Sequence, residues 1–567
     1  MALINTTTSS AVSSRYNKGS MLYITMLTLV ATLGGLLFGY DTAVVNGAEK
    51  SLVELFIYKE QAGQFIYPPD IMTVIAQYKL LMTAVIYLVF IVISGQIIKL
   101  LGNKKGLTIS AFIILAVTIW AYIFNTKPIP TLDQETALKD TVDAVKGFVI
   151  ASALIGCIIG GALAGFVSKT FGRKNGLMIA AIAFLVSSIG TWKPDTFNFT
   201  GLHTVYSFVV YRIIAGIGVG IASMISPMYI AEIAPANIRG RLVSYNQFAI
   251  IFGMLVIYFV NYFIARQGDE QWLITDGWRW MFFSGVIPSA LFLILLFFVP
   301  ETPRYLVLKD KEDKALSVLT RIAGKNDAPK ILSEIKETLH EHNAPWLSYG
   351  FMVIFIGIML SVFQQFVGIN VVLYYAGNIF RNMGASTDAS LLQTIIVGAI
   401  NLLFTVVAIL TVDKFGRKPL MIIGSIGMAI SMFALGFTFY LGGQELSSTA
   451  SFTALIFMLT YVAAFAMSWG PVCWVLLSEI FPNSIRGAMS IAVAAQWIAN
   501  WIVSLTFPML NDNVWLVEKF NHGFSYWIYG LMGILSAIFM WKLVPETKGK
   551  SLEEIEKLWK KATDTNK

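Results

Sequence analysis

The sequence is poor in charge and in cysteine. Of its 567 residues only 13% are Asp, Glu, Lys or Arg, whereas a soluble domain carries about a quarter. The two cysteines, Cys157 and Cys473, both fall in apolar stretches, so no disulfide framework is expected. Because 56% of the residues are hydrophobic and the mean hydropathy is +0.69, we expect lipid rather than water to surround most of the chain.

Sequence motifs for nucleotide, metal and catalytic chemistry are also missing. No G-x-x-x-x-G-K-[ST] string occurs, so ATP is not expected to drive the protein. The HEH at 340–342 lacks metalloprotease spacing. Glycines at Gly216–Gly220, like Gly161 and Gly165, lie in apolar spans, where they favour close helix packing. The net charge of +8 is scattered in short clusters and indicates no nucleic-acid partner. We therefore expect no enzyme, no cofactor and no metal site.

What the chain does contain is a series of fourteen apolar stretches, each near the about 20 residues that cross a bilayer. Their predicted ranges are 21–47, 72–99, 107–125, 147–167, 175–192, 205–231, 242–264, 279–299, 349–378, 391–412, 419–440, 451–479, 488–510 and 524–544. The basic clusters near Arg173, Arg239 and Arg417 all fall on one side under this count, as do both termini. The positive-inside rule makes that side the cytoplasm.

Three strings occur twice along the chain. They are FGRK from Phe171 and Phe415, VPET from Val299 and Val544, and AEIAPANIRG at 231–240 with SEIFPNSIRG at 478–487. The offsets are 415 − 171 = 244, 544 − 299 = 245 and 478 − 231 = 247. Such near-constant spacing indicates a tandem duplication. Parallel repeats of this kind place the solute site near the midplane between the two halves.

We therefore predict an all-α membrane protein with two pseudo-symmetric six-helix halves plus an inserted two-helix hairpin. The predicted divisions are a cytoplasmic tail at 1–20, an N-terminal half at 21–300 with the hairpin at 70–125, cytoplasmic amphipathic helices at 301–348, a C-terminal half at 349–546 and a cytoplasmic helix at 547–567. The hairpin accounts for most of a surplus of 134 − 49 = 85 residues before the first FGRK, and an external loop accounts for the rest. Lys79 lies near the start of the first hairpin span and is expected to extend its side chain to the outer membrane surface. A hairpin that lies on the membrane surface is the alternative.

Together these strings resemble the sugar-porter family of the major facilitator superfamily. The strings that carry the resemblance are GGLLFGYD (34–41), FGRK, AEIAPANIRG, PETPRYL (300–306), FQQFVGIN (363–370), SWGPVCWVLLSEIFP (468–482) and PETKG (545–549). Within the family they are most similar to those of bacterial D-xylose–proton symporters. The resemblance implies alternating access between the halves and symport of a monosaccharide, D-xylose or a similar pentose or hexose, with protons across the cell (inner) membrane.

Amide and aromatic side chains inside the spans are the candidates for sugar contact, because hydroxyl groups need donors and acceptors and sugar faces lie against rings. Each amide can also simply bond a neighbouring helix. The resemblance carries the sugar contacts onto Gln247, Gln364, Gln365, Asn370, Asn401, Trp474 and Gln496, with Phe38 and Tyr374 as further pocket residues. Gly470 and Pro471 predict a bend beside this site.

One carboxylate, Asp41, lies in the apolar part of the first span, and Arg212 opens a later one. A buried acid resists ionisation unless a cation compensates, so a proton can replace the pairing with Arg212. Symporters that the chain resembles carry an acid here, and related passive facilitators tend to lack it. A static ion pair is the alternative, since Ser284-Gly285 supplies no second acid where some proton-coupled relatives have one.

Charged residues of the repeated strings are expected to form a cytoplasmic gate, in which the Glu of each longer string pairs with the Arg of the same string. The candidates are Glu232, Arg239, Glu479, Arg486, Arg173 and Arg417. Such pairs would close the inner side in one state and release it in the other. Static surface pairs, which contribute little, are the alternative.

Two other functions stay open at this point. One is a passive sugar uniporter of the same fold, and the other is a membrane sugar sensor that binds without transport. The short stretch after the last motif, 551–567, disfavours the sensor. The expected partners are a sugar, protons and the lipid bilayer, and the sequence leaves the oligomeric state open.

Overall fold

The computed structural model describes residues 21–61, 64–235, 238–339, 345–443, 446–482, 485, 488–548 and 559. Within these ranges the chain is almost entirely helical, and its only strands are an antiparallel pair, β1 (Lys59–Gln61) and β2 (Gln64–Ile66). Fourteen helical segments of this described part are long and apolar enough to cross a bilayer, which confirms the predicted number.

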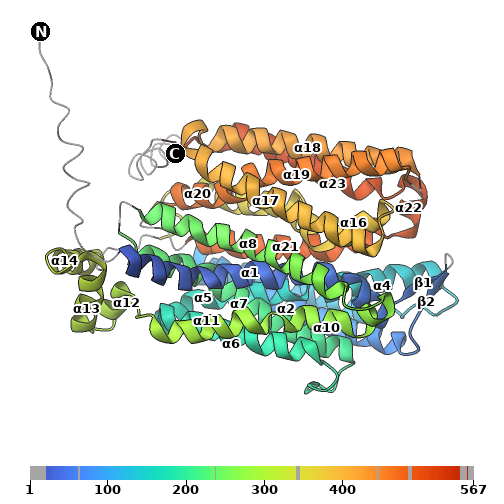
Figure 1. The fold of residues 1–567 in the computed structure, drawn as a ribbon, viewed down its shortest axis with the longest axis horizontal. Coiled ribbons are helices and arrows are strands. Elements are labelled where there is room, and N and C mark those ends of the chain that lie inside the picture. The colour runs from blue at the N-terminus through green and yellow to red at the C-terminus, as the bar shows by residue number, and fades with distance from the viewer. Residues whose placement is uncertain are drawn as a thin grey trace, which may run out of the picture.

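The helices form two bundles that lie side by side along their length (Figure 1). The N-terminal half contains α1 (Met21–Phe56), α4 (Glu135–Ile150), α5 (Ser152–Phe171), α6 (Arg173–Trp192), α7 (Thr204–Ile233), α8 (Arg239–Ala265), α9 (Glu270–Trp272), the π-helix η1 (Leu273–Gly277), α10 (Trp278–Phe283) and α11 (Val286–Phe298). The C-terminal half contains α15 (Phe351–Phe366), α16 (Ile369–Asn382), α17 (Thr387–Phe415), α18 (Arg417–Gly442), α19 (Ser448–Met467), α20 (Pro471–Ile480), α21 (Met489–Asn511), α22 (Val514–Phe520) and α23 (Gly523–Leu543).

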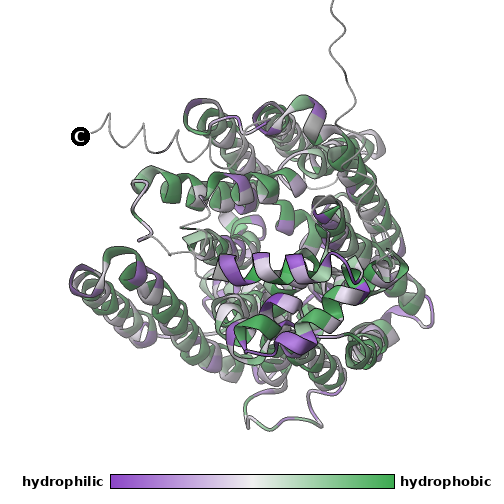
Figure 2. Ribbon diagram, turned by 90° about the vertical axis from the view of Figure 1, so that its left-hand side faces the viewer, coloured by the Kyte–Doolittle hydropathy of each residue, from purple (hydrophilic) through white to green (hydrophobic). Residues whose placement is uncertain are grey.

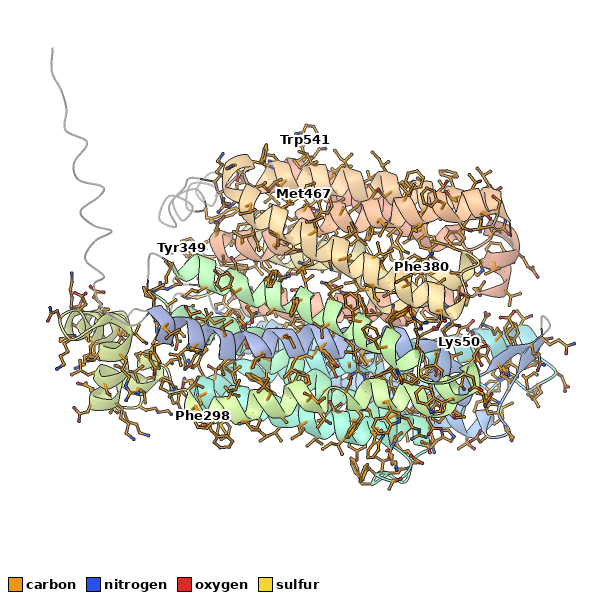
Figure 3. The ribbon with its side chains drawn as sticks, in the orientation of Figure 1. Lys50, Phe298, Tyr349, Phe380, Met467 and Trp541 are labelled. Carbon is orange, nitrogen blue, oxygen red and sulfur yellow. The ribbon has the colours of Figure 1, made fainter. Side chains whose placement is uncertain are left out.

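The two ends of the bundle differ. At the end that we call the arginine end, Arg173 and Arg417 begin α6 and α18. The strand end is the opposite one, where β1 and β2 lie (Figure 1). Seen from the arginine end, hydrophilic residues gather on the short helices that face the viewer, and hydrophobic residues cover the helices around them (Figure 2). On the outer faces of the two halves, Phe298 and Trp541 are 80% and 65% exposed (Figure 3). Large apolar side chains on such faces suit contact with lipid.

The link between the halves holds three short helices, α12 (Pro303–Leu308), α13 (Glu312–Ala323) and α14 (Ala328–Leu339). In α13, Ala315, Val318 and Ile322 are buried along one face. The expected tail at 1–20 and most of the expected helix at 547–567 lie outside the described residues. Trp559 is described: it is buried, and its indole nitrogen donates to the backbone carbonyl of Ile480 at 3.1 Å.

Two of the differences from the predicted ranges concern helices around the site, and one predicted bend is confirmed. α1 continues to Phe56, past the predicted end at 47, and in this extension Ser51 donates to the carbonyl of Leu273 in η1 at 3.1 Å. The span predicted at 349–378 breaks between α15 and α16, where Gly368 takes a left-handed conformation with φ of 94°. The bend predicted at Gly470 is confirmed, because α19 ends at Met467 and α20 begins at the following proline.

A helical hairpin, α2 (Ile71–Leu101) and α3 (Asn103–Thr126), lies on the outside of the N-terminal half. α2 packs against α5 and α4, whereas α3 packs mainly against α2 and exposes most of its surface. Lys79 of α2 donates to the backbone carbonyls of Asn125, at 3.2 Å, and of Lys127. Its ammonium group therefore satisfies carbonyls at the end of α3 that the helix itself leaves unpaired.

Glycine allows α5 and α7 to pack closely. A Cβ on Gly216 would lie 1.8 Å from the carbonyl oxygen of Ala153, so no larger residue fits there. This confirms the packing role predicted for that stretch. Gly165 was expected to act in the same way, but a Cβ there would meet no atom within 4 Å, so that expectation was wrong. A Cβ on Gly161 would lie 3.4 Å from a ring carbon of Trp497 in the C-terminal half, and the Gly161 backbone nitrogen would lie 2.4 Å from a Cβ on Gly220, so Gly161 takes part in the close packing of α5 and α7.

Candidate functional site

An ion pair joins two central helices of the N-terminal half. Arg212 of α7 donates from Nη1 to Oδ1 of Asp41 on α1 at 2.8 Å, and from Nη2 to the backbone carbonyl of Asp41 at 3.0 Å. The arginine side chain is 2% exposed and the aspartate side chain 13% exposed. Each charge is thus held mainly by the other rather than by water. The structure brings together the two residues that the sequence singles out for proton coupling.

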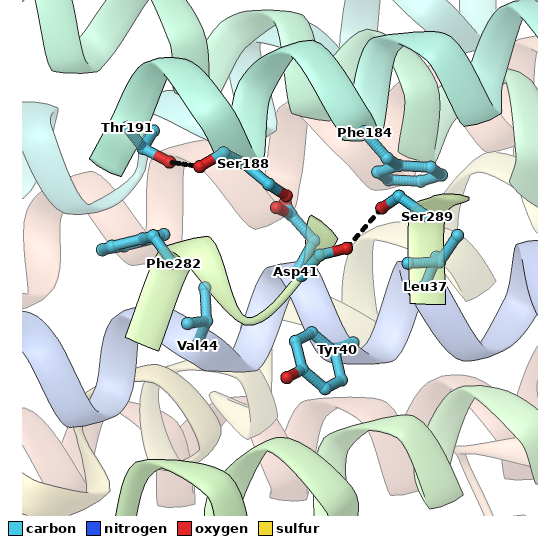
Figure 4. Close-up of a pocket in the computed structure, with 10 residues that line it drawn as sticks. Leu37, Tyr40, Asp41, Val44, Phe184, Ser188, Thr191, Phe282 and Ser289 are labelled. Carbon is cyan, nitrogen blue, oxygen red and sulfur yellow. Dashed lines mark hydrogen bonds between the residues drawn. The ribbon is translucent and has the colours of Figure 1, made fainter. Parts of the chain in front are cut away.

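The second carboxylate oxygen of Asp41, Oδ2, is buried and has no hydrogen-bond partner among the described residues. Asp41 lines a niche that also receives Ser188 and Thr191 of α6 and Ser289 of α11 (Figure 4). The niche has a volume of about 10 Å³, close to the room that one water molecule needs. Gly285 keeps it open, since a Cβ there would lie 2.7 Å from Oγ of Ser188. An unpaired carboxylate oxygen beside hydroxyl groups is suited to receive a proton.

Four of the predicted amides form one hydrogen-bond network in the C-terminal half. Oε1 of Gln364 accepts from Gln496 at 2.6 Å and from Gln365 at 3.4 Å. Asn370 in turn donates to Oε1 of Gln365. The three glutamines are at most 7% exposed. They lie on α15 and α21, and the break at Gly368 places Asn370, at the start of α16, beside them.

The network also reaches the break between α19 and α20. Nε2 of Gln364 donates to the backbone carbonyls of Trp469 at 2.9 Å and Gly470 at 3.3 Å. Interrupting a helix frees carbonyls for such partners. Trp469 is fully buried, and its indole nitrogen donates to Oγ of Ser425 at 2.7 Å. Sequence reasoning missed Trp469; its position directly before the predicted bend was the available signal.

The remaining sugar-site candidates make no hydrogen bond to the network in the residues that the structure describes. Phe38 of α1 meets Trp497 of α21 with ring centroids 5.6 Å apart, so an aromatic contact joins the two halves. Tyr374 of α16 is 4% exposed. Three further candidates on α8, α17 and α20 make no hydrogen bond to the network within the described part of the chain; they are Gln247, Asn401 and Trp474.

The repeated strings come together at the arginine end in two matching clusters. In the N-terminal half, Arg173 donates to Oε1 of Glu232 at 3.2 Å from Nε and 2.8 Å from Nη2. In the C-terminal half, Arg417 donates to Glu479 at 3.1 Å and 2.8 Å from the same two nitrogens. The three strings of the first half, which begin at residues 171, 231 and 299, thus meet in the same way as their counterparts in the second half. Those counterparts lie 244 to 247 positions later in the sequence. The duplication is therefore structural as well as sequential.

The glutamate of each VPET string binds a helix start. The carboxylate of Glu301 accepts from the backbone nitrogens of Arg173 at 3.0 Å and Lys174 at 3.1 Å, and Glu546 does the same for Arg417 at 3.2 Å and Lys418 at 3.0 Å. Carboxylates are favoured at helix N-termini, where amides lack partners. Burial raises the pKa of Glu301, although these amide donors oppose the shift.

The expected pairing within each longer string was wrong for Glu232. Its carboxylate is taken by Arg173 and by the hydroxyl of Thr302 at 2.6 Å, and Arg239 is exposed. Arg173 reaches it because α6 begins directly beside the end of α7. Arg486, the other expected partner, lies outside the described residues. Both described clusters hold helices together within one half, and no ion pair between described residues crosses between the halves at this end.

Two repeated helical bundles, a polar network at a helix break and a charge pair deep in an apolar bundle define a secondary transporter of the major facilitator class. The chain belongs to the family described as sugar (and other) transporter, whose profile matches residues 27–559. The D-xylose-proton symporter of Escherichia coli K12 is 51% identical over 97% of this chain and 98% of its own length. The glucose facilitated diffusion protein of Zymomonas mobilis is 41% identical over 74% of this chain and 88% of its own. The resemblance read from the sequence is thereby confirmed.

The fold also matches solved structures. The inward open conformation of the xylose transporter XylE from E. coli superimposes with a TM-score of 0.72 at 50% identity, covering 95% of this chain and all of that one. The proton:xylose symporter XylE bound to 6-bromo-6-deoxy-D-glucose gives a TM-score of 0.70 at 51% identity, covering 96% of this chain and all of that one. The predicted major facilitator fold is confirmed.

Proposed function

We propose that this protein moves a monosaccharide, D-xylose or a similar pentose or hexose, together with protons by alternating access between its two halves. The observation that carries the proposal is the geometry at Asp41. One carboxylate oxygen pairs with Arg212 at 2.8 Å, and the other is buried beside a niche without a partner. A proton that binds Asp41 neutralises one member of this pair, so proton binding changes the electrostatic free energy that holds α1 to α7.

The sugar site that we propose is the amide network and the aromatic residues around it. Amides that donate and accept at one point match the hydroxyl groups of a sugar ring. Gln364 and Gln496 lie next to the helix break, and Phe38 reaches the same region of α21 from the other half through its contact with Trp497. A site held by both halves changes its access when the halves move relative to each other. D-xylose is favoured because the 51% identical relative is a D-xylose-proton symporter.

We place the protein in the cell membrane with the arginine end in the cytoplasm. Basic residues lie at that end in the FGRK strings, next to the VPET strings and in α12 to α14. Segments rich in Lys and Arg favour the cytoplasmic side. Both termini would then be cytoplasmic. The clusters of Arg173 with Glu232 and of Arg417 with Glu479 would hold the inner ends of the helices within each half while the halves rock.

Passive sugar uniport is the second candidate function. The similarity to a glucose facilitated diffusion protein from Zymomonas mobilis favours it, because 41% identity is compatible with a shared sugar site without proton coupling. The charge pair at Asp41 favours the symporter, since an intramembrane acid is costly unless it has a function.

Transport in proteoliposomes separates these functions. Counterflow with a panel of labelled sugars identifies the substrate without any proton gradient. Uphill uptake in response to an imposed inside-alkaline gradient then tests proton coupling. Counterflow without gradient-driven accumulation supports the uniporter, and saturable binding without counterflow supports a sensor.

A further inference from the structure

At the strand end, four charged residues meet between the two halves, three of them on helices and one directly after a helix. Glu49 of α1 and Lys146 of α4 come from the N-terminal half, and Arg381 of α16 and Asp512, which follows α21, come from the C-terminal half. We call them the strand-end charge cluster. Their side chains are 2%, 3%, 21% and 14% exposed, in that order. Charges this deeply buried carry a large desolvation cost unless they are paired.

The pairs of the cluster cross between the halves. Nζ of Lys146 lies 2.8 Å from Oδ2 of Asp512, and Arg381 donates from Nη2 to Oε2 of Glu49. Each crossing pair thus joins one charge of each half. Lys146 also lies 3.1 Å from Oε1 of Glu49, within its own half. The four charges sum to zero, and each half contributes one positive and one negative charge.

Neighbouring residues close the same seam. Nδ2 of Asn46 donates to the carbonyl of Leu373 at 3.1 Å, and Asn513 donates to Asp140 at 2.8 Å. Lys50, which lies at the boundary between the halves (Figure 3), donates to Thr387 at 3.4 Å. The strand end is therefore shut in this structure.

The backbone is shaped for this contact. A Cβ on Gly147 would lie 2.2 Å from the carbonyl oxygen of Leu505, so only glycine lets α4 approach α21 this closely. Lys146, the preceding residue, is thereby brought within reach of Asp512. Burial alone would raise the pKa of the Asp512 carboxyl, but Lys146 and Lys139 attract its charged form and lower the pKa to about 2. Asp512 is thus held as the anion that the crossing pair needs.

We propose that Glu49, Lys146, Arg381 and Asp512 form an ionic latch that holds the outer side closed and must be broken for the outward-facing state of each transport cycle. The inference rests on the proposed alternating access. Its physical basis is the balance of charge. When the halves separate, Glu49 keeps Lys146 as its partner, and water enters around all four residues. Opening therefore leaves no charge unpaired in an apolar environment. An apolar seam of equal area would expose its surface to water on every cycle.

The test measures the separation of the halves directly. Spin labels at Gln267→Cys and Glu518→Cys report on the strand end, because both residues are exposed and lie on different halves. A second pair, Asn175→Cys with Lys414→Cys, reports on the arginine end in the same way. The two native cysteines are buried and do not compete for label. Pulsed electron paramagnetic resonance in nanodiscs then gives the distance distributions.

Removing one member of a crossing pair opens the strand end. Glu49→Gln and Arg381→Gln are each expected to raise the long-distance fraction at the strand end at least threefold, with a matching shift to shorter distances at the arginine end. Because the ion pair of Arg381 is with Glu49, the double variant is expected to shift no further than Glu49→Gln alone. Asp195→Asn is the matched control: it removes the ion pair with Arg279, of length 3.0 Å, which lies within the N-terminal half. Its distances stay as in the wild type.

Unchanged distances in folded Glu49→Gln and Arg381→Gln overturn the latch, as does an equal shift in Asp195→Asn. If either variant fails to fold, Asp512→Asn tests the other crossing pair with the same labels and the same two outcomes. Sugar counterflow of the labelled wild type separates this inference from the proposed function. A distance shift without counterflow refutes transport and leaves the latch, and counterflow without a distance shift refutes the latch alone.

Discussion

Replacing Asp41 by asparagine removes a charge and almost nothing else. The asparagine side chain is of nearly the same size, and its oxygen can still accept from Nη1 of Arg212, now 2.8 Å from Oδ1. The second arginine contact, to the backbone carbonyl of residue 41 at 3.0 Å, is unaffected. What the variant loses is the group that binds a proton. We expect Asp41→Asn to retain sugar binding and sugar exchange and to lose all proton-driven accumulation.

The size of the loss follows from the driving force. One elementary charge moved across about 100 mV gains about 2.3 kcal/mol, which sustains about a 50-fold concentration ratio of sugar. Asp41→Asn should reduce that ratio to about one under the same gradient, since no proton is carried with the sugar. The variant leaves Arg212 with a neutral partner in a buried site, a change that costs about 3–5 kcal/mol of stability when a pair is broken outright. Adding Arg212→Met removes the uncompensated charge if the single variant folds poorly.

The assay uses proteoliposomes with an imposed pH gradient and a potassium diffusion potential, with labelled D-xylose as the substrate. Counterflow in the same vesicles, without a gradient, confirms that the site works. Asp195→Asn is the control, because its carboxylate lies outside the central pair and pairs with Arg279 at the strand end. Accumulation by Asp41→Asn equal to that of the wild type would show that the proton is carried elsewhere and would refute the coupling role of this residue.

Three further predictions follow from the site, the gate and the hairpin. Gln365→Ala and Trp474→Ala should each weaken sugar binding by about 1–3 kcal/mol in calorimetry, through an unpaired polar partner or lost contact area; unchanged affinity in both moves the site elsewhere. Glu232→Gln removes an ion pair that lies within the N-terminal half, between α6 and α7, so it should lower the thermal stability of the protein and leave cytoplasmic labelling of an introduced cysteine as in the wild type; a changed labelling rate would show that this cluster acts as a gate. Asn103→Cys, at the start of α3, should resist an impermeant reagent added outside intact cells; reaction there excludes two crossings.

Sequence reasoning was most successful where one residue and its immediate surroundings carry the signal. The apolar spans, the repeated strings, and the polar residues Asp41, Arg212 and Gln364 are each conspicuous against lipid-facing neighbours. The bend at Gly470 was predicted because proline follows it. The break at Gly368 was not, because a lone glycine within an apolar run is ambiguous between a packing contact and a left-handed turn.

The residues of the site were easier to predict from the sequence than the residue that each of them binds. Many arginines along the chain could pair with Glu232, and the sequence does not show that α6 begins beside the end of α7. The strand-end charge cluster lay beyond sequence reasoning altogether. Hundreds of positions in the sequence separate its first member from its last, and each residue alone looks like an ordinary charge near a helix end. Glu49 also fell outside the predicted first span, since α1 is longer than its apolar run.

A sugar that enters the proposed site mostly exchanges hydrogen bonds and gains new ones at few atoms, such as Oε1 of Gln496, which is buried without a partner among the described residues. Oε1 of Gln364 already accepts from Gln496 at 2.6 Å, and its amide nitrogen already donates to the carbonyl of Trp469 at 2.9 Å. Each hydroxyl that takes one of these positions sets an amide free, and that amide must find another hydroxyl. The net free energy of binding is therefore a small difference between two nearly complete sets of bonds. A carrier benefits from this arrangement, because a ligand that is held only slightly more firmly than the protein holds itself is also released quickly on the far side.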